Sequence, residues 1–242
     1  VSTTLGYEPY GSCLYVHSNG NIYAFISDRG ADDFGTHSVR QYLLTRSGET
    51  VSAGSVVRTI TADGVMEGMA ADDTTGVIFV SREDHGLYRY SAAPGGSTTP
   101  TTVDTVGAGN LVADVEDVAI ARHADGDKLL VSSQGDSSYH VYNLATLAHE
   151  QRFTIARPGG STSVLDTDGL DVLLTPMGDF TDGLIVVHDG GRTPTSGFAF
   201  VDAALVFGPL PVSDFPFQGY GHALLGDQPV VAIHVGVNRV WP

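Results

Sequence analysis

The sequence predicts an all-β fold made of repeated four-stranded antiparallel units, and three observations support this prediction. The 242 residues include 30 Gly and 11 Pro, which favour short strands and frequent turns over long helices. Runs of about five to seven residues rich in Val, Ile, Tyr and Phe are separated by turns of Gly, Asp and Ser. These runs recur in the same order with a period of about 50 residues.

Each unit begins with a polar or aromatic residue followed by a short apolar run. The first strands are expected at Tyr10–Leu14, Glu67–Ala70, Glu116–Ala119 and Asp168–Val172. A second apolar run ends in polar residues. The second strands are expected at Ile22–Asp28, Val77–Glu83, Leu129–Gln134 and Leu184–Asp189.

The third run of each unit alternates aromatic and polar residues, as strands with one buried face do. The third strands are expected at Val39–Leu43, Gly86–Tyr90, Ser138–Tyr142 and Gly197–Val201. A less regular fourth run is present in two of the units. It covers Val56–Ile60 and His149–Ile155, and the C-terminal tail adds the candidate strands Pro229–Val235 and Asn238–Trp241.

Four strands per unit at this period are typical of the blades of a β-propeller, in which four-stranded sheets pack side by side around a central channel. An ordinary β-sandwich is the alternative, although it would not repeat one pattern four times. The segments Pro94–Pro100 and Pro158–Ser161 are rich in Gly, Ser and Pro and are expected to be loops. Residues 1–242 are therefore expected to form a single propeller domain.

The composition excludes several classes of protein. The chain has 28 Asp and Glu against 12 Lys and Arg, a net charge of −16, which excludes unaided binding to nucleic acid because phosphate backbones need a basic surface. No apolar run approaches the roughly 18 residues of a membrane span, and Val1 opens no signal peptide, so we expect a soluble chain with no membrane partner. The single cysteine, Cys13, excludes an intrachain disulfide and is expected in the core.

The repeat brings polar residues together at one end of the channel. In a propeller the first strand of every blade lines the channel, so the residues that begin these strands converge on one rim. Here they are Tyr10, Glu67, Glu116 and Asp168. The second strands run antiparallel to the first and end at the same rim, with Asp28, Arg29, Glu83, Gln134 and Asp189.

Clustered carboxylates repel one another unless a cation offsets their charge. Calcium takes six to eight oxygen ligands in loose geometry, which suits acids gathered from several blades, whereas no paired-cysteine or HExxH pattern indicates zinc. Any single acid is more simply explained as a turn cap or a solvated side chain. Taken together, the acids at equivalent places in the repeat predict a calcium site formed by Glu67, Glu83, Glu116, Asp168 and Asp189.

Several segments resemble the central blades of the β-propeller phytases. They are Glu67–Asp73, Glu83–Asp84, Tyr88–Pro94, Asp114–Glu116, Ser132–Tyr139, Asp166–Val172 and Val187–Gly190. The resemblance runs from about Glu8 to about Val201 in the family's order. It implies a six-bladed, calcium-dependent enzyme that hydrolyses phosphomonoesters of myo-inositol hexakisphosphate, and it places all five acids on calcium-ligand or active-site positions.

The resemblance also implies two substrate contacts. Tyr10 falls on a substrate-contacting tyrosine of the family. Arg29 replaces a phosphate-binding lysine, which keeps the positive charge and adds a bidentate fork suited to phosphate.

The sequence departs from the family's pattern at several positions. Gly30 stands where the family has a glutamate, for which Asp32 or Asp33 would substitute after a loop shift. Thr162 replaces an aspartate ligand. A further polar ligand is expected at Ser196 or Gly197.

The largest departure is at the N-terminus. The family's first two blades supply an Asp-Asp pair, a Lys and an Arg to the same site, and no counterpart precedes Val1. We therefore expect about four blades plus extra strands, which form a partial ring or close as a smaller one. A second chain or a missing N-terminal segment would complete the partial ring.

These observations predict a calcium-dependent, phytase-like hydrolase that attacks phosphorus with a metal-activated water. Glu67 or Glu116 would be the general base, and Tyr10 and Arg29 would hold a substrate phosphate. We expect a secreted protein, because millimolar extracellular calcium suits weak carboxylate sites. One alternative is a non-catalytic, calcium-stabilised propeller that binds a ligand or partner on its rim. Another is a lactonase-like propeller hydrolase that cleaves esters.

Overall fold

A computed structural model describes residues 5–30, 35–156, 163–191 and 195–209, together with two short strands near the C-terminus. Its first two sheets are four-stranded, and in each the strands pair in chain order. The first blade consists of β1 (Pro9–Val16), β2 (Ile22–Asp28), β3 (Thr36–Ser47) and β4 (Thr50–Asp63). The second blade consists of β5 (Met66–Asp72), β6 (Val77–Arg82), β7 (Gly86–Ser91) and β8 (Thr101–Thr105).

The next two sheets continue the same antiparallel pattern. The third blade consists of β9 (Val115–Ala121), β10 (Lys128–Ser133), the 3-10 turn η1 (Gln134–Asp136), β11 (Ser138–Asn143) and β12 (His149–Phe153). The fourth blade has three described strands, β13 (Leu170–Leu173), β14 (Leu184–Asp189) and β15 (Gly197–Asp202), followed by the helix α1 (Ala204–Phe207). A separate pair is formed by β16 (Leu224–Leu225) and β17 (Gln228–Pro229).

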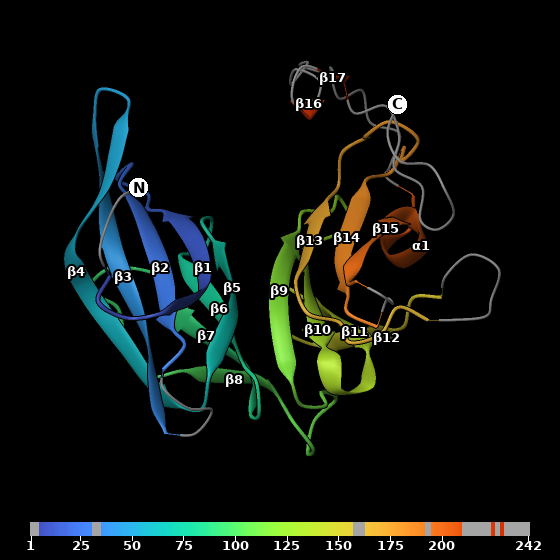
Figure 1. The fold of residues 1–242 in the computed structure, drawn as a ribbon, viewed down its shortest axis with the longest axis horizontal. Coiled ribbons are helices and arrows are strands. Elements are labelled where there is room, and N and C mark those ends of the chain that lie inside the picture. Colours follow the sequence, from blue (N-terminus) through green and yellow to red (C-terminus); the bar gives the residue numbers. More distant parts are fainter. Residues whose placement is uncertain are drawn as a thin grey trace.

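The four blades follow one another around an open arc, with β1, β5, β9 and β13 nearest its middle (Figure 1). Each pair of neighbouring blades shares one apolar core. On β6, Ile78 and Val80 pack into the core shared with the first blade, whereas Phe79 packs into the core shared with the third. Each second strand contains a continuous apolar run, such as Val77–Val80 in β6, because both faces of that run are buried.

Turn chemistry explains the acidic hairpin loop between β5 and β6. The Asp72 carboxylate accepts the N–H of Thr74 at 3.1 Å and the hydroxyl of Thr75. Gly76 adopts a left-handed φ of 67°, which glycine tolerates better than other residues. Asp72 is therefore accounted for by the turn, whereas Asp73 accepts the N–H of Val16 in β1 at 2.8 Å.

Most of the predicted elements are confirmed, and the all-β propeller fold is correct. The predicted strands Ile22–Asp28 and Leu184–Asp189 have the observed bounds of β2 and β14. Sequence patterns missed β8, because its five residues are mostly threonine and offer one apolar side chain, Val103. The first strand of the fourth blade begins at Leu170 and not at Asp168.

Three further expectations concern Cys13, the C-terminal tail and membrane-spanning segments. Cys13 packs against the core between the first and second blades, as expected, and burial raises the pKa of its thiol to about 12. The predicted tail strands lie outside the described residues, except that Pro229 belongs to β17. Over the part of the chain that is described, no helix is long and apolar enough to cross a membrane.

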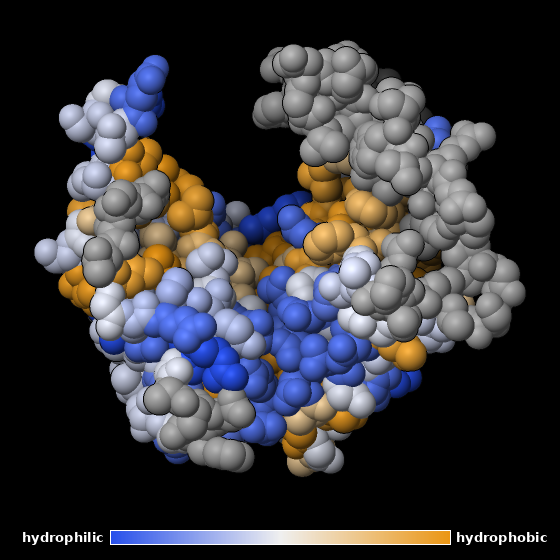
Figure 2. Space-filling view, viewed as in Figure 1, coloured by the Kyte–Doolittle hydropathy of each residue, from blue (hydrophilic) through white to orange (hydrophobic). Residues whose placement is uncertain are grey.

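Among the described residues, each end of the arc carries a large exposed apolar side chain. On the first blade, Leu14 pairs with Ala24, which pairs with Tyr42, so the three side chains share one face. Leu14 is 62 % exposed, whereas Ala24 and Tyr42 are buried. On the fourth blade, Phe198 is also 62 % exposed. Figure 2 shows a hollow between these two ends with hydrophobic surface on both walls. Interior blades bury such faces against a neighbour, and the completion of the ring by further chain stays a prediction.

Candidate metal and phosphate site

A β-bulge places the rim residues in each of the first three blades. The ladder between the first two strands shifts register around Tyr10 in β1, around Glu67 in β5 and around Glu116 in β9. Each of these residues is the second of its strand. A bulge bends the strand and re-aims its side chains, so the same local irregularity directs one tyrosine and two glutamates at equivalent places.

A repeated backbone hydrogen bond brings the end of the second strand to the same rim. The N–H groups of Arg29, Glu83 and Gln134 donate to the carbonyl oxygens directly before the three first strands. The acceptors are Glu8 at 2.9 Å, Val65 at 3.1 Å and Asp114 at 2.7 Å, respectively. The expected convergence of strand starts and strand ends is therefore observed in these three blades.

Three glutamates form the centre of the site. One carboxylate oxygen each from Glu67, Glu83 and Glu116 lies within 4.8 Å of the other two. Glu116 is 6 % exposed, and the Oε2 atom of Glu67 is buried without a hydrogen-bond partner. A buried carboxylate oxygen without a hydrogen-bond donor lowers the stability of the fold unless a cation or an ordered water binds it.

The electrostatics show how tightly these acids are grouped. Burial, followed by the hydrogen bond and charge of Glu67, raises the pKa of Glu116, and the charges of Asp168 and Glu83 raise it further. Burial and the charges of Glu67, Glu83 and Glu116 also raise the pKa of Tyr10. Three ionised carboxylates at these distances are therefore more stable with a bound cation than without one.

Tyr10 and Arg29 lie beside the trio, as expected from the repeat. The Arg29 guanidinium carbon is 5.1 Å from the centre of the Tyr10 ring, and its charge acts to lower the pKa of the Tyr10 hydroxyl. This arrangement resembles a cation–π contact. It gives the acidic rim one positive charge and one phenol, two groups that can contact a phosphate.

Two of the five predicted ligands are not members of the trio. Asp168 precedes β13 and its side chain is 48 % exposed, with Oδ2 3.9 Å from Nδ1 of His188. Asp189 is buried, and its Oδ1 accepts the N–H of Leu165 at 3.4 Å. The charge of Asp168 reaches Glu116. Metal binding by Asp168 and Asp189 stays a prediction.

The backbone pairing of the fourth blade explains the position of Asp189. The carbonyl oxygen two residues before the rim acid accepts the N–H of Glu83 in the second blade and the N–H of Gly190, at 3.3 Å, in the fourth. Gly190 therefore occupies the place of Glu83, and Asp189 lies one residue before it.

The departures from the family's pattern have mixed outcomes. Gly30 has a left-handed φ of 74°, and a β-carbon there would lie 2.5 Å from the His37 ring, so a glutamate would require a different local backbone. Asp32, Asp33 and Thr162 lie outside the described residues. Ser196 is exposed and directly precedes β15, which begins at Gly197.

The sequence reasoning missed Asp117. When the four blades are aligned, Asp117 occupies the place that glycine occupies in the other three, at Gly11, Gly68 and Gly169. An aspartate in place of a glycine is the sequence signal that could have identified it. Its carboxylate accepts the N–H groups of Val118 at 2.8 Å and Leu170 at 3.0 Å, which links the inner strands of the third and fourth blades. Burial raises its pKa to about 6.

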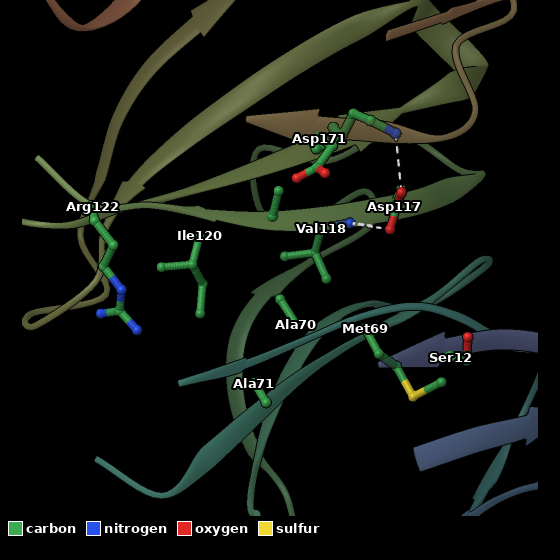
Figure 3. A pocket seen from close by; sticks show the side chains of 11 residues that line it. Ser12, Met69, Ala70, Ala71, Asp117, Val118, Ile120, Arg122 and Asp171 are labelled. Carbon is green, nitrogen blue, oxygen red and sulfur yellow. Dashed lines mark hydrogen bonds between the residues drawn. The ribbon is translucent and has the colours of Figure 1, made fainter. Parts of the chain in front are cut away.

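A cavity of about 440 Å³ lies between the four inner strands next to Asp117. Ser12 of β1, Met69 of β5, Val118 of β9 and Asp171 of β13 are among its lining residues (Figure 3). The two dashed bonds of Asp117 in Figure 3 hold one side of this cavity together. The inner strands thus line this cavity, and two of them, β5 and β9, carry Glu67 and Glu116, whereas Glu83 directly follows β6.

Solved structures support the fold. The chain aligns with a component of the COPII outer coat vertex on membranes with a TM-score of 0.52 and 10 % identity, over 81 % of this chain and 48 % of that one. A component of the COPII coat assembled on membranes gives the same TM-score and identity, over 81 % of this chain and 26 % of that one. Identities this low indicate shared architecture alone.

Sequence relatives identify the family. The 3-phytase of Bacillus subtilis (strain 168) is 31 % identical over 195 residues, which make up 78 % of this chain and 49 % of that protein. The chain therefore spans about half the length of this curated relative. The sequence profile of the family named Phytase matches residues 1–201. The resemblance seen in the sequence is thereby confirmed, and the chain belongs to the phytase family.

Proposed function

We propose that this chain carries the catalytic rim of a calcium-dependent phytase, which hydrolyses phosphomonoesters of myo-inositol hexakisphosphate. The observation that carries the proposal is the meeting of Glu67, Glu83 and Glu116 within 4.8 Å, on a chain of the phytase family. Membership of this family favours phosphate esters over the carboxylic esters of a lactonase.

The trio fits a calcium ion. Calcium–oxygen distances of about 2.3 to 2.6 Å allow two ligands of one ion to be about 5 Å apart at most, and the trio's oxygens satisfy this limit. All three donors are carboxylate oxygens, the hard ligands that calcium prefers over the nitrogen and sulfur ligands of zinc. The Oε2 atom of Glu67, buried without a hydrogen-bond partner, is an oxygen that a bound cation would satisfy.

In the proposed mechanism the protein groups have separate tasks. Arg29 and Tyr10 hold a substrate phosphate at the rim. Glu116, kept ionised by the bound cation, would accept the proton of the attacking water, with Glu67 as the alternative base. Bound calcium supplies charge neutralisation for the substrate phosphates and lowers the pKa of water. A chain with a net charge of −16 needs such neutralisation to bind a polyanion.

We propose a secreted location, since extracellular calcium is millimolar and a site of few carboxylates binds it weakly. We also propose that residues 1–242 form one propeller domain that further chain completes. The family match to half of a longer relative supports this view.

Calcium should increase both the activity and the stability of the purified chain. We expect phosphate release from inositol hexakisphosphate in calcium and none in a chelator. At a calcium concentration of about 100 times the dissociation constant, linkage predicts a stabilisation of about 2.7 kcal/mol. Colorimetric phosphate release and thermal unfolding, each in calcium, magnesium and chelator, measure the two effects.

The same experiment separates the proposal from its main alternative. Calcium-dependent stabilisation without phosphate release would favour a non-catalytic binding module, an outcome made plausible by the half-length match. Equal melting temperatures in calcium and chelator would rule out the cation site itself.

A further inference from the structure

We propose that Ser81 is a positioning residue that fixes the spacing between Glu67 and Glu116. This inference rests on the proposed cation site and deepens it. Glu67 and Glu116 belong to different sheets, because β5 is in the second blade and β9 in the third. Ladder hydrogen bonds therefore fix neither their separation nor their relative height along the channel.

The Ser81 hydroxyl connects the backbones of these two strands. Its oxygen accepts the N–H of Gly68, the residue after Glu67, at 2.8 Å. It also donates to the carbonyl oxygen of Glu116 and lies 3.3 Å from the carbonyl oxygen of Gly68. A hydroxyl has a single proton, so the Ser81 hydroxyl donates to one carbonyl oxygen at a time while its oxygen accepts the N–H of Gly68.

Burial makes this connection hard to replace. Ser81 is 0 % exposed, so water does not compete for the groups that it binds, and their loss would leave buried polar atoms unpaired. Ser81 also lies opposite the bulge that carries Glu67, in the gap in the register between Met66 and Met69. It thus stabilises the irregular backbone that directs the Glu67 side chain.

The equivalent serines show what is particular to Ser81. Ser27 accepts the N–H of Gly11 at 2.7 Å and lies 3.3 Å from its carbonyl oxygen, and both contacts stay within the first blade. Ser132 bonds to the carbonyl and hydroxyl oxygens of Thr167. Of these three serines, Ser81 alone contacts the main chain of a glutamate in the trio.

The physical role follows from the charge of the site. Ionised Glu67 and Glu116 repel each other, and this repulsion acts to separate β5 from β9 when no cation is bound. A hydrogen bond between the two backbones resists that separation and keeps the oxygens at a distance that one ion can bridge. Preorganisation of this kind increases affinity because less ordering is required on binding.

The test is calcium binding by Ser81→Ala, measured by titration calorimetry on the purified 242-residue chain, with Ser27→Ala as the matched control. Each variant removes a fully buried serine hydroxyl that bonds to a bulge glycine. We expect the calcium dissociation constant to increase about tenfold in Ser81→Ala and less than twofold in Ser27→Ala. Both variants should lose thermal stability in chelator, Ser81→Ala the more, and Ser81→Thr, which keeps the hydroxyl, should restore affinity.

Each outcome decides a different question. Equal calcium affinities in Ser81→Ala and Ser27→Ala would overturn the role of Ser81 while leaving the cation site intact. No calcium binding by the unmodified chain would overturn the proposed cation site, and the role of Ser81 with it. If circular dichroism shows that Ser81→Ala does not fold, Ser81→Cys, with a similar shape and a weaker hydrogen bond, takes its place in the same comparison.

Discussion

Replacing Glu116 with glutamine should abolish calcium-stimulated phosphate release and, in chelator, increase the stability of the chain. Burial and the neighbouring carboxylates raise the pKa of Glu116, so its ionised form costs folding free energy when no cation is bound. Glutamine keeps the shape of the side chain but removes the charge and the general base. We expect activity to fall by about 100-fold or more.

The pH dependence of stability tests the same residue. A carboxyl group whose pKa is higher in the folded than in the unfolded chain favours folding when protonated, and this contribution is lost as the pH rises above the unfolded value. The stability of the calcium-free chain should therefore decline as the pH rises from the ordinary glutamate pKa of 4.5. Thermal unfolding in chelator across this range should show a smaller decline for Glu116→Gln.

Asp104 provides a matched control for the loss of a buried carboxylate. Burial acts to raise the pKa of Asp104, but hydrogen bonds from Asn110 and Tyr142 outweigh it and lower the pKa. Its carboxylate accepts these bonds at 2.8 Å and 2.7 Å. Asp104→Asn should therefore lower the melting temperature and leave the calcium response unchanged. A Glu116→Gln chain that behaves like Asp104→Asn would remove Glu116 from the site.

The rim could be predicted from the sequence because it depends on the repeat. Tyr10, Glu67 and Glu116 occupy the same place in three successive units, and the bulge and the returning N–H recur with them. Local patterns of apolar and polar residues determine where each strand starts and ends. Those positions alone place the three side chains at one end of the channel.

Contacts between blades could not be predicted in this way. Asp189 and Glu83 align in the sequence repeat, yet Gly190 takes the structural place of Glu83 and Asp189 contacts Leu165 instead. The roles of Ser81 and Asp117 depend on distances to strands of the neighbouring blades. A sequence pattern fixes the place of a residue within its own sheet, whereas packing between sheets decides what its side chain meets.

Replacing Gly68 with alanine should strongly destabilise the protein, because this glycine lies where the second and third blades approach most closely at the rim. A β-carbon at position 68 would lie 2.4 Å from the Cα of Asp117 and 2.4 Å from the carbonyl oxygen of Glu116. Both are backbone atoms, which cannot rotate away as the end of a side chain can. The inner strands β5 and β9 would have to separate, at a cost of about 3 kcal/mol or more.

The same separation would move Glu67 away from Glu116, so Gly68→Ala should also weaken calcium binding in any fraction that folds. Gly95→Ala is the control, since Gly95 is exposed and a β-carbon there would meet nothing within 4 Å; it should change stability by less than about 0.5 kcal/mol. Urea unfolding of the two variants in chelator, followed by calcium titration, measures both effects. Equal midpoints for the two variants would contradict the close approach of the strands and, with it, the origin of the spacing between the two glutamates.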